Sequence, residues 1–569
     1  MLLVEVDKIK KYFGDRLLLD IEELKIYDTD RIGIVGVNGA GKTTLMDILS
    51  QRMLPDEGIV KINGRYSYVS QLAQPEHDTI SEEMASKFAV SAKWNDTMSG
   101  GEKTRFKIAQ AFSDHSMLLF ADEPTSNVDV EGIGLLENRL LEYSAGLVII
   151  SHDRRFLDQL CNKILEIEDG KVREYTGNYS QYALQKQAER EQERFKYQQY
   201  AKEKKRLERA MIELREKSSS TKKTPKRMGN SEARLHKMGD QRAKSALDGA
   251  KKSLESRISH LQGSEKPKEL DTIQLRVPES NHLHSKVVIE GTKLNKSFSG
   301  KVLFKDANFF VGNRAKVALI GKNGCGKSTL LKMIIDHQGQ AGAIRVAIGA
   351  KIGYFSQEFD ILQHDLSILE NVMDTSIYPE TFARMFLARL LFKGDDIYKK
   401  VRVLSGGERV KVSFAKILLQ DFNLLILDEP TNYLDLYSLE VIEQALREYD
   451  RTLLFVSHDR GFIHNVADHI MTIEDQQIRM FAGSYEEYLA KQGEKSKGNQ
   501  GRVSQGKGNG RTDNSTADIE MQLMITQNRL SDVIGKLSTT TKKDDLGSLD
   551  EEYHKLLTEI KQLRAKLSP

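Results

Sequence analysis

Short apolar runs recur along the chain and predict strands buried in parallel sheets. They cover residues 31–36, 118–121 and 147–151 in the first part of the chain and residues 316–321, 424–427 and 453–457 in the second. The first run in each set leads into a glycine-rich turn that opens a helix. Residues 1–13 predict one further strand. The pattern therefore indicates an α/β fold that occurs twice.

Between these two parts the hydrophobic residues become sparse and follow helical spacing. Residues 189–217 predict one long helix and residues 232–261 a second, each with a single apolar seam. The seams are Leu207, Met211 and Leu214 in the first helix and Leu247, Leu254, Ile258 and Leu261 in the second. Pro225 and Gly229 prevent residues 218–230 from being helical. We therefore expect a long antiparallel helical hairpin with residues 218–230 at its tip.

The C-terminal region combines a flexible composition with another pair of apolar stripes. Residues 491–513 are rich in Gly, Lys, Ser and Asn, as is typical of a tether. The stripes comprise Ile519, Leu523, Leu530, Ile534 and Leu537, and, at heptad spacing, Leu549, Tyr553, Leu556, Ile560, Leu563 and Leu567. They predict a small helical hairpin, and the pattern leaves its role open between packing, dimerisation and contact with a partner.

These patterns divide the chain into five parts. They are a first α/β domain (1–182), a helical-hairpin linker (183–284), a second α/β domain (285–490), a tether (491–513) and a C-terminal helical hairpin (514–569). A chain of 569 residues can bury several substantial cores.

Composition narrows the compartment and the class of protein. The two cysteines, Cys161 and Cys325, cannot form a disulfide framework, so we expect a reducing, cytoplasmic location. The first residues are too briefly apolar for a signal peptide. No apolar run approaches the roughly 20 residues needed to cross a bilayer. The chain itself is therefore not expected to be the membrane part of a transporter.

Five polar motifs follow the predicted strands, and the set occurs twice in the same order. Each set contains GxxxxGK[ST], an isolated Gln, SGGE, DEPT and SHDR. The sets occupy residues 36–43, 71, 99–102, 122–125 and 151–154, and residues 321–328, 357, 405–408, 428–431 and 457–460. The differences 405−99, 429−123 and 458−152 all equal 306. A lone glycine turn, buried Asp or His is often structural, but joint occurrence at matched spacing predicts nucleotide binding in both parts.

The glycine-rich segments are suited to hold phosphates. Glycines allow backbone N–H groups to wrap a phosphate at the N-terminus of a helix. Lys42 and Lys327 would reach the β- and γ-phosphates of a nucleotide, while Thr43 and Ser328 would offer hydroxyl groups to Mg²⁺.

Carboxylates and imidazoles follow the other strands, at the edge where open α/β sheets bind ligands. The first Asp of each DEPT suits the Mg²⁺ shell, the Glu suits a general base that polarises the attacking water, and the neutral His can sense or orient the γ-phosphate. These residues are Asp122 and Asp428, Glu123 and Glu429, and His152 and His458. In both copies the His follows the Glu by 29 residues.

This array resembles the ATP-binding cassette (ABC) family, with two P-loop cassettes on one chain. SGGE distinguishes that family from other P-loop proteins, because its signature loop caps the γ-phosphate held by the opposite cassette. The resemblance implies two composite sites. The first joins Lys42, Glu123 and His152 with Ser405, Gly406 and Gly407, and the second joins Lys327, Glu429 and His458 with Ser99, Gly100 and Gly101.

The same resemblance implies the remaining ATP contacts. Gln71 and Gln357 would lie near Mg²⁺ and water, and Tyr12 and Phe298 would stack on adenine, with Phe13 a competitor for Tyr12. The loop contacts would come from Gly36, Asn38, Gly39, Gly41 and Thr44, and from Gly321, Asn323, Gly324, Gly326 and Thr329.

The two copies differ beside the catalytic motifs. Met98, Ala121 and residues 126–129 (SNVD) stand where the second copy has Leu404, Leu427 and residues 432–435 (NYLD). Both glutamates are present, so we expect two hydrolysis-competent sites that differ in rate.

Positive charge is concentrated in the linker. Residues 183–270 hold 24 Lys and Arg against 13 Asp and Glu, and 24−13 gives +11, whereas the whole chain has a net charge of +3. A basic stretch is usually a solvated linker. Here the apolar seams of the two helices predict that the basic residues lie on a projecting helical hairpin. Its cations would meet phosphates without reading sequence, which suits structured RNA. The candidates are Lys222, Lys223, Lys226, Arg227, Arg234, Lys237, Arg242 and Lys244.

Two cassettes without a membrane domain, joined by a charged helical hairpin, resemble the ABC-F family of translation-associated ATPases. That resemblance implies a monomer with paired cassettes and no membrane subunit. It would enter the ribosomal tRNA exit site with ATP bound, and its linker would reach P-site tRNA, large-subunit rRNA and the peptidyl-transferase centre. One branch of the family protects ribosomes from large-subunit antibiotics, and another regulates translation without drugs.

Motif spacing favours the antibiotic-resistance branch. Gln71 and Ser99 are separated by 28 residues, whereas Gln357 and Ser405 are separated by 48. The shorter segment leaves no room for the extra arm that, by the resemblance, housekeeping members often carry in the first cassette. A housekeeping translation factor is the alternative within the family. A transporter ATPase would require separate membrane subunits and leaves the basic hairpin unexplained, while the hairpin alone does not exclude a DNA-associated protein.

Overall fold

The computed structural model describes most of the chain. The described residues are 1–70, 74–75, 77–114, 116–126, 128–220, 249–259, 283, 285–298, 301–336, 344–356, 361–392, 394–432, 434–499, 526, 530, 533 and 543–567. Gln71, Gln357 and all eight basic candidates of the linker lie outside these residues. The same holds for residues 221–230 of the predicted tip and for most of the first C-terminal stripe.

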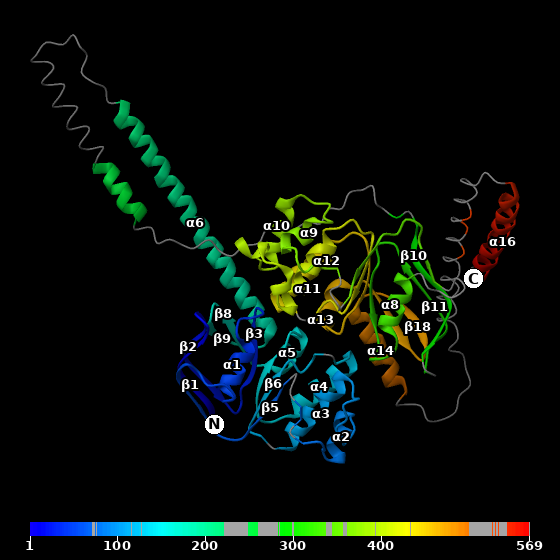
Figure 1. The fold of residues 1–569 in the computed structure, drawn as a ribbon, viewed down its shortest axis with the longest axis horizontal. Helices are drawn as coiled ribbons and strands as arrows, with labels where there is room; N and C mark the ends of the chain where they lie inside the picture. Colours follow the sequence, from blue (N-terminus) through cyan, green and yellow to red (C-terminus); the bar gives the residue numbers. More distant parts are fainter. Residues whose placement is uncertain are drawn as a thin grey trace, which may run out of the picture. The chain divides into compact units, whose positions relative to one another are not determined.

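Two six-stranded sheets with equivalent strand order form the centres of the N-terminal half (residues 1–179) and the C-terminal half (residues 285–499) (Figure 1). The N-terminal order is β5(Tyr66–Val69), β6(Leu118–Asp122), β7(Gly146–Ile150), β3(Arg31–Gly36), β8(Lys163–Glu168) and β9(Lys171–Thr176). The C-terminal order is β14(Ile352–Phe355), β15(Leu424–Asp428), β16(Thr452–Val456), β12(Lys316–Ile320), β17(His469–Glu474) and β18(Gln477–Ala482). Neighbouring strands are parallel except at the last pair. The six predicted strands are thus confirmed, each within about one residue at its ends.

A three-stranded antiparallel sheet accompanies each central sheet. These sheets comprise β2(Arg16–Tyr27), β1(Leu2–Phe13) and β4(Glu57–Ile62), and β11(Lys301–Gly312), β10(Val287–Phe298) and β13(Ile344–Val346). In the N-terminal half, Val4 and Val6 of β1, Ile32 of β3 and Leu45 of the first helix belong to one buried apolar cluster. The predicted α/β class, with two nucleotide-binding-type units, is confirmed.

Helices in equivalent places follow the strands of both halves. The N-terminal half contains α1(Lys42–Leu49), α2(Glu82–Phe88), α3(Gly100–Ser113), α4(Val130–Glu142) and α5(Arg154–Leu160). The C-terminal half contains α8(Lys327–Ile335), α9(Ile368–Met373), α10(Glu380–Arg389), the 3₁₀ turns η3(Gly394–Tyr398) and η4(Val401–Val403), α11(Gly406–Leu418), α12(Leu436–Glu448), α13(Arg460–Val466) and α14(Tyr485–Asn499). Among the described residues, α2 is the one helix between Gln71 and Ser99, whereas α9, α10, η3 and η4 lie between Gln357 and Ser405, which accounts for the unequal motif spacing.

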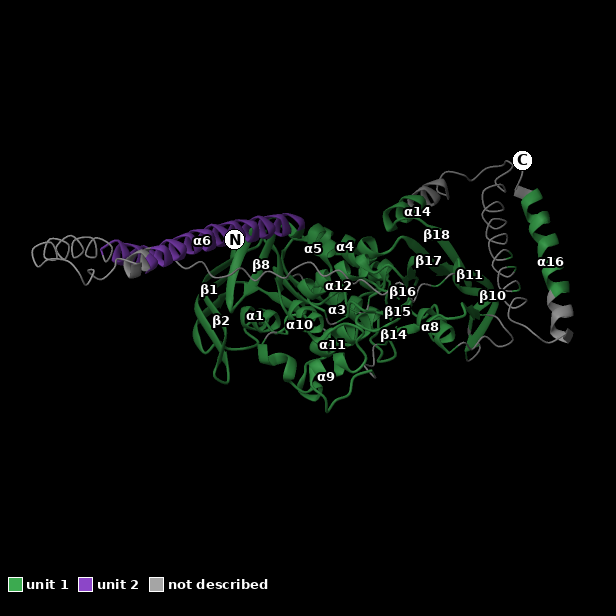
Figure 2. Cartoon of the chain, turned by 90° about the horizontal axis from the view of Figure 1, so that it is seen from above, with its two compact units in different colours: residues 1–179, 273–569 green, residues 180–272 purple. Residues whose placement is uncertain are grey.

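The linker forms a compact unit of its own, residues 180–272 (Figure 2). Its first helix, α6(Tyr179–Ser220), starts ten residues before the predicted start at Glu189 and includes residues 218–220 of the predicted tip. Leu207 of the predicted seam is buried. Residues 249–259 are helical and run alongside α6 (Figure 1).

The C-terminal region agrees only in part with the sequence patterns. Residues 491–499 continue α14, so this section of the predicted tether is helical. Helix α16(Lys543–Leu567) carries the heptad stripe, and Leu556, Ile560 and Leu563 on it are buried. No helix within the described ranges is long and apolar enough to cross a membrane.

Candidate functional site

The two glycine-rich segments connect a buried strand to a helix in the same way. Gly41 and Gly326 cap α1 and α8 with φ angles of +101° and +110°, which side-chain-bearing residues rarely adopt. A Cβ on Gly41 would lie 3.2 Å from side-chain atoms of Leu18 and Leu19. The positive φ of the turn therefore favours glycine, and a Cβ at Gly41 would also have to displace the leucine side chains by a few tenths of an ångström.

The lysine side chain of each glycine-rich loop folds back onto the backbone of the same loop. Lys42 Nζ donates hydrogen bonds to the carbonyl oxygens of Gly36 at 2.9 Å and Val37 at 3.2 Å. Lys327 Nζ makes the equivalent bonds to Gly321 at 2.8 Å and Lys322 at 3.2 Å. Both side chains are buried. Burial lowers the pKa of Lys42, against the attraction of Glu123.

An oxygen-rich group begins where the loop helix meets the neighbouring strand. Asp122 at the end of β6 is hydrogen-bonded to the side chain of Thr43, and Asp428 at the end of β15 is hydrogen-bonded to Ser328. Burial raises the pKa of both carboxyls, although these hydrogen bonds oppose the shift.

The glutamates that follow these aspartates occupy an unusual backbone conformation. Glu123 and Glu429 have φ angles of +50° and +51°. Their backbone N–H groups donate to Ile150 and Val456 at the ends of the adjacent strands, at 2.9 and 3.0 Å. Left-handed non-glycine residues are strained and tend to cluster at functional sites. The strain recurs at equivalent positions in both halves.

Each glutamate lies beside the histidine that follows the adjacent strand, β7 or β16. His152 Nε2 is 3.2 Å from Glu123 Oε1, and His458 Nε2 is 3.1 Å from Glu429 Oε1. Burial raises the pKa of Glu123 to about 8 and that of Glu429 to about 7, despite the nearby lysines. Burial also lowers the pKa of His152 to about 3 and that of His458 to about 4. Both imidazoles are therefore neutral near pH 7.

The SGGE serines cap the helices that follow them. Ser99 Oγ accepts a hydrogen bond from Glu102 N at 3.3 Å, and Glu102 Oε2 accepts one from Ser99 N at 2.8 Å. Ser405 and Glu408 form the same capping box at 3.3 and 2.8 Å. Each box fixes the N-terminus of α3 or α11, the end of a helix that favours negative charge.

Both glycine-rich loops and both SGGE segments line one cavity of about 1370 Å³. Its walls contain Lys42, Thr43, Glu123 and His152 together with Lys327, Ser328, Glu429 and His458. Ser99, Gly100, Ser405 and Gly407 complete the walls from the SGGE side. The structure thus brings together, around one cavity, residues that the sequence places about 300 positions apart.

Other predicted site residues are placed around this cavity as follows. Asn38, Gly39, Gly41, Thr44, Asp122, Asn323, Gly324, Gly326 and Thr329 also line it. Gly36, Gly101, Gly321, Gly406 and Asp428 are absent from its lining, as are Tyr12 and Phe298. Tyr12 and Phe298 are exposed at the ends of β1 and β10. Arg16 and Leu303, on the strands that pair with β1 and β10, line the cavity instead.

Two aspartates that sequence reasoning missed connect the halves at these loops. Asp435 Oδ2 accepts a hydrogen bond from Asn38 N, and Asp129 Oδ2 accepts one from Asn323 N, both at 3.2 Å. Each aspartate also caps the helix that follows it, α12 or α4. Since 435−129 equals 306, the repeat offset itself was a signal that could have identified them.

In the second half, the aspartate Asp435 forms a buried ion pair with Lys411. Lys411 Nζ is 2.8 Å from Asp435 Oδ2, and both side chains are almost fully buried. Burial would raise the pKa of Asp435, but Lys411 outweighs it and lowers the pKa to about 2. Asp435 is therefore ionised wherever the protein is folded near neutral pH.

Comparison with protein families agrees with this geometry. The family described as ABC transporter matches residues 19–85 and 304–432, and a second family of the same description matches residues 165–256. These segments include the first glycine-rich loop, the SGGE and DEPT motifs of the second half, and part of the linker.

Curated relatives cover nearly the whole chain. The erythromycin resistance ATP-binding protein MsrA of Staphylococcus epidermidis is 32% identical over 483 residues, which covers 84% of this chain and 98% of MsrA. The ribosome protection protein VmlR of Bacillus subtilis is 29% identical over 574 residues, which covers 99% of this chain and 98% of VmlR. Among solved structures, the complex of the archaeal ribosomal stalk protein aP1 with the ribosome recycling factor aABCE1 matches with a TM-score of 0.56. That match has 19% identity, covers 85% of this chain and 92% of that one, and supports the fold alone.

Proposed function

Since the chain belongs to the ABC-F family of tandem ATP-binding cassette proteins and is an ATPase, we propose that it acts on the ribosome. In this proposal the ATP-bound protein enters the tRNA exit site. Its linker then remodels P-site tRNA and the rRNA around the peptidyl-transferase centre, and it thereby protects the cytoplasmic ribosome from large-subunit antibiotics.

The observation that carries this proposal is the end-to-end similarity to VmlR, whose name describes ribosome protection. A match over 99% of this chain includes the linker as well as both cassettes. A relative that shared only the cassettes would support ATP hydrolysis but no particular target. The resistance function named for MsrA points in the same direction.

The linker has the charge that an RNA partner requires. Its residues 183–270 carry a net charge of +11 within a chain of +3. Cations on a projecting hairpin can contact RNA phosphates through shape and charge, without reading bases. The eight basic residues from Lys222 to Lys244 are the proposed contacts.

For the ATP chemistry, we assign a role to each paired group. Lys42 and Lys327 bind the β- and γ-phosphates, and the capped N-terminus of α11 or α3 in the opposite cassette stabilises the γ-phosphate. Glu123 and Glu429 accept a proton from the attacking water, and the neutral imidazoles beside them hold each carboxylate in place.

The oxygen donors at each loop fit Mg²⁺. Thr43 with Asp122, and Ser328 with Asp428, present a hydroxyl and a carboxylate side by side, which is the hard ligand set that Mg²⁺ prefers. Glu429, the residue after Asp428, keeps a buried oxygen, Oε2, that has no hydrogen-bond partner within the described residues. When bound, Mg²⁺ would neutralise charge on the β- and γ-phosphates.

Ribosome co-sedimentation tests the proposal. The Glu123→Gln/Glu429→Gln double variant should bind ATP without hydrolysing it and should pellet with ribosomes in ATP but not in ADP. A Lys42→Ala/Lys327→Ala variant is the control, because it should bind ribosomes in neither nucleotide. Absence of ATP-dependent pelleting by the double Gln variant would contradict ribosome binding, and stronger retention on duplex DNA would favour a DNA-associated protein.

Drug protection is tested separately in cells. Expression should raise the inhibitory concentration of large-subunit antibiotics, and removal of residues 221–230 from the linker should abolish that effect. Removal of ten residues from 501–513 is the matched control and should leave protection intact. Ribosome binding with no change in drug response would instead indicate a translation factor that does not act on drugs.

A further inference from the structure

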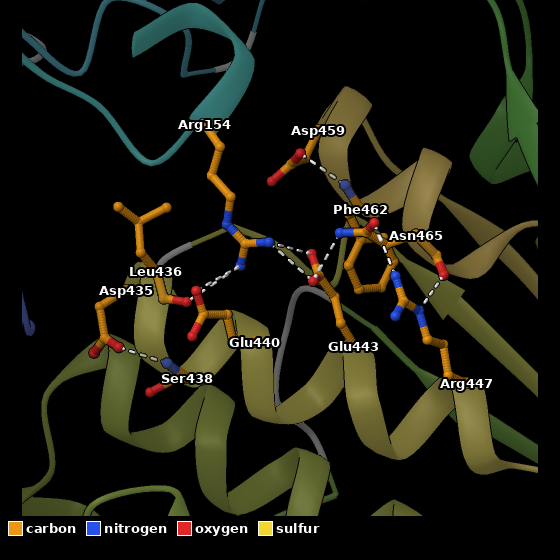
Figure 3. Close-up of polar contacts among 10 residues, drawn as sticks. All are labelled: Arg154, Asp435, Leu436, Ser438, Glu440, Glu443, Arg447, Asp459, Phe462 and Asn465. Carbon is orange, nitrogen blue, oxygen red and sulfur yellow. Dashed lines mark hydrogen bonds and ion pairs between the residues drawn. The ribbon is translucent and has the colours of Figure 1, made fainter. Parts of the chain in front are cut away.

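An arginine from each half penetrates the opposite half beside the candidate ATP sites. Arg154 opens α5, two residues after His152, and reaches α12 of the C-terminal half (Figure 3). Its Nη1 is 3.0 and 3.3 Å from the two carboxylate oxygens of Glu443, and its Nη2 donates to the carbonyl of Leu436 at 3.3 Å. The contact therefore joins the His-bearing loop of one half to a helix of the other.

The second half returns the same contact. Arg460 opens α13, two residues after His458, and its guanidinium binds both carboxylate oxygens of Glu137 on α4, with Nη1 3.0 Å from Oε2. The differences 460−154 and 443−137 both equal 306, so the two ion pairs occupy equivalent positions in the repeat. This reciprocity makes an accidental pairing of surface charges improbable.

Both ion pairs are shielded from solvent. The side chains of Glu443 and Glu137 are 7% and 6% exposed, and those of Arg154 and Arg460 are 16% and 11% exposed. Exposed ion pairs contribute little, whereas loss of one partner from a buried pair leaves an uncompensated charge. The Arg460 pair is bidentate, because each terminal nitrogen binds one oxygen of Glu137, whereas Arg154 binds both oxygens of Glu443 through Nη1 and the Leu436 carbonyl through Nη2; either pattern fixes direction as well as distance.

In each half, the arginine and the glycine-rich loop contact the same helix of the opposite half at two different points. Helix α12 is capped by Asp435, which accepts a hydrogen bond from the backbone N–H of Asn38 in the first loop. Arg154, from the same half as Asn38, binds α12 at Leu436 and Glu443. One composite site therefore contains the loop, His152 and both attachment points on α12, and Asn323, His458, Asp129 and α4 repeat the arrangement.

We propose that Arg154 and Arg460 are positioning residues that couple closure of the two cassettes to hydrolysis, each at the ATP site of its own P-loop. When the opposite cassette is in place, the ion pair fixes the loop that carries the histidine beside the catalytic glutamate. When the cassettes separate, the loop loses this support. Neither arginine needs to touch ATP for this role.

The two contacts differ in their second carboxylate. Arg154 Nη2 is also 3.9 Å from Glu440 of the opposite half, where the other copy has Gly134. Arg460 Nη2 is instead 3.7 Å from Asp153 at the start of α5. Because the surroundings differ, each arginine must be tested at its own site.

Site-selective kinetics test the coupling. In the Glu429→Gln background only the first site hydrolyses ATP, and there Arg154→Ala should lower kcat about tenfold or more, because small misplacements of catalytic groups are costly. The KM for ATP should change less than about threefold, since one P-loop provides most ground-state contacts. In the Glu123→Gln background, Arg460→Ala should have the large effect and Arg154→Ala a smaller one.

Arg155→Ala is the matched control. Arg155 is the neighbouring residue and also crosses between halves, but it pairs with exposed Glu486 at 3.4 Å. The Arg155→Ala substitution should leave kcat and KM within about twofold of the values of the same background without it, as expected for an exposed pair. An equal loss from Arg155→Ala and Arg154→Ala, an equal effect of Arg154→Ala in both backgrounds, or a rise in KM with kcat intact would each overturn the proposal.

Charge exchange provides a second test in the otherwise unaltered protein. Arg154→Glu and Glu443→Arg should each lower kcat, and their combination should recover at least half of the loss in logarithmic units. Thermal unfolding of all three variants establishes that they are folded. If the single variants are folded and the kcat of their combination is no higher than that of the worse single variant, the coupling is refuted. This test also decides if neither the Glu429→Gln nor the Glu123→Gln background has measurable turnover.

Discussion

Glu123 and Glu429 combine backbone strain with an electrostatic penalty at the residue scale. Each has a left-handed φ near +50° and a buried carboxyl beside a neutral imidazole. A folded protein retains such positions when the geometry serves function. The adjacent strands hold the strain through the backbone bonds to Ile150 and Val456.

Removal of the strain should stabilise the protein while it abolishes activity. Glu429→Gly and Glu429→Ala both delete the carboxyl, but only glycine adopts φ of +51° without steric cost. We expect the Gly variant to be more stable than the Ala variant by about 1 kcal/mol. Thermal unfolding measures the difference, and an Ala variant at least as stable as the Gly variant would show that the conformation is not strained.

The buried carboxyls should also make stability depend on pH in the nucleotide-free protein. Their folded pKa values, about 8 for Glu123 and about 7 for Glu429, exceed the ordinary value of 4.5, so their contribution is full below pH 4.5 and is lost as pH rises through 7 to 8. His152 and His458 act oppositely, because their lowered pKa values remove stability only below about pH 6.5. Between pH 6.5 and 8 the histidines therefore contribute no change, but Asp459, whose pKa burial raises to about 7, loses stability there together with the glutamates.

A comparison of unfolding midpoints at pH 6.5 and pH 8 tests this dependence. The unmodified protein should lose more stability across this interval than the Glu123→Gln/Glu429→Gln variant, which keeps both histidines and all other titrating groups. Parallel curves for the two proteins would show that the glutamates do not titrate in this range.

At the residue scale, the sequence identified residues that line one cavity but did not predict their backbone geometry. The repeated motifs identified Lys42, Glu123 and His152, which the structure places around one cavity with their counterparts. They did not reveal the positive φ of Glu123, because a strand-to-loop transition of this kind depends on tertiary packing. Asp129 and Arg154 were missed because their partners lie more than 190 residues away and no local pattern reports them.

At the scale of elements, the SGGE serines have two roles that can be separated. As N-caps they stabilise α3 and α11, and as the ends of those helices they face the cavity. Aspartate caps a helix as well as serine does, but it places a negative charge where a phosphate would bind. Replacement of the serine by aspartate should therefore keep the helix cap but weaken the attraction of the helix end for phosphate.

Ser405→Asp should accordingly keep the helix and lose the activity. We expect stability within about 0.5 kcal/mol of the unmodified protein, whereas Ser405→Ala should cost about 1 kcal/mol. ATP hydrolysis should fall much more in the Asp variant than in the Ala variant. Unfolding and ATPase assays on the two variants decide, and an active Asp variant would show that α11 does not face the phosphate.

Helix boundaries show where sequence patterns lose information. The predicted start of the linker helix at Glu189 followed the first charged residues, but α6 already begins at Tyr179, whose side chain is buried. Residues 491–499 have the polar composition of a tether, yet they extend α14. In both cases a polar segment continues a helix that tertiary packing has nucleated, and composition does not record that context.

At the scale of the whole molecule, the two halves are joined by pairs of equivalent contacts that differ in strength. Asp435 contacts the first loop and is fully buried against Lys411, whereas Asp129, which contacts the second loop, is only partly buried near Arg105. The repeat thus preserves the position of the contact while the burial of its charges differs. If the two sites are found to hydrolyse ATP at different rates, this difference in burial would be a physical basis for it.

Loss of the two aspartates should therefore have unequal consequences. Asp435→Ala leaves the Lys411 ammonium buried without its partner and should destabilise α12 by about 3 kcal/mol, the scale of a broken buried ion pair. Asp129→Ala should cost about 1 kcal/mol, the scale of a lost helix cap. Hydrogen exchange of the α12 and α4 amides measures each effect locally, which matters because a chain of several domains need not unfold in one step.

Lys411→Met separates the buried charge from the contact between halves. If an unpaired ammonium causes most of the loss, the Lys411→Met/Asp435→Ala double variant should recover much of the stability that Asp435→Ala removes. The hydrogen bond to Asn38 remains absent in that double variant, so its ATPase activity should stay low even when α12 is protected again. Recovery of both properties would mean that Asp435 acts only as the partner of Lys411, and recovery of neither would mean that the backbone contact with the first loop dominates.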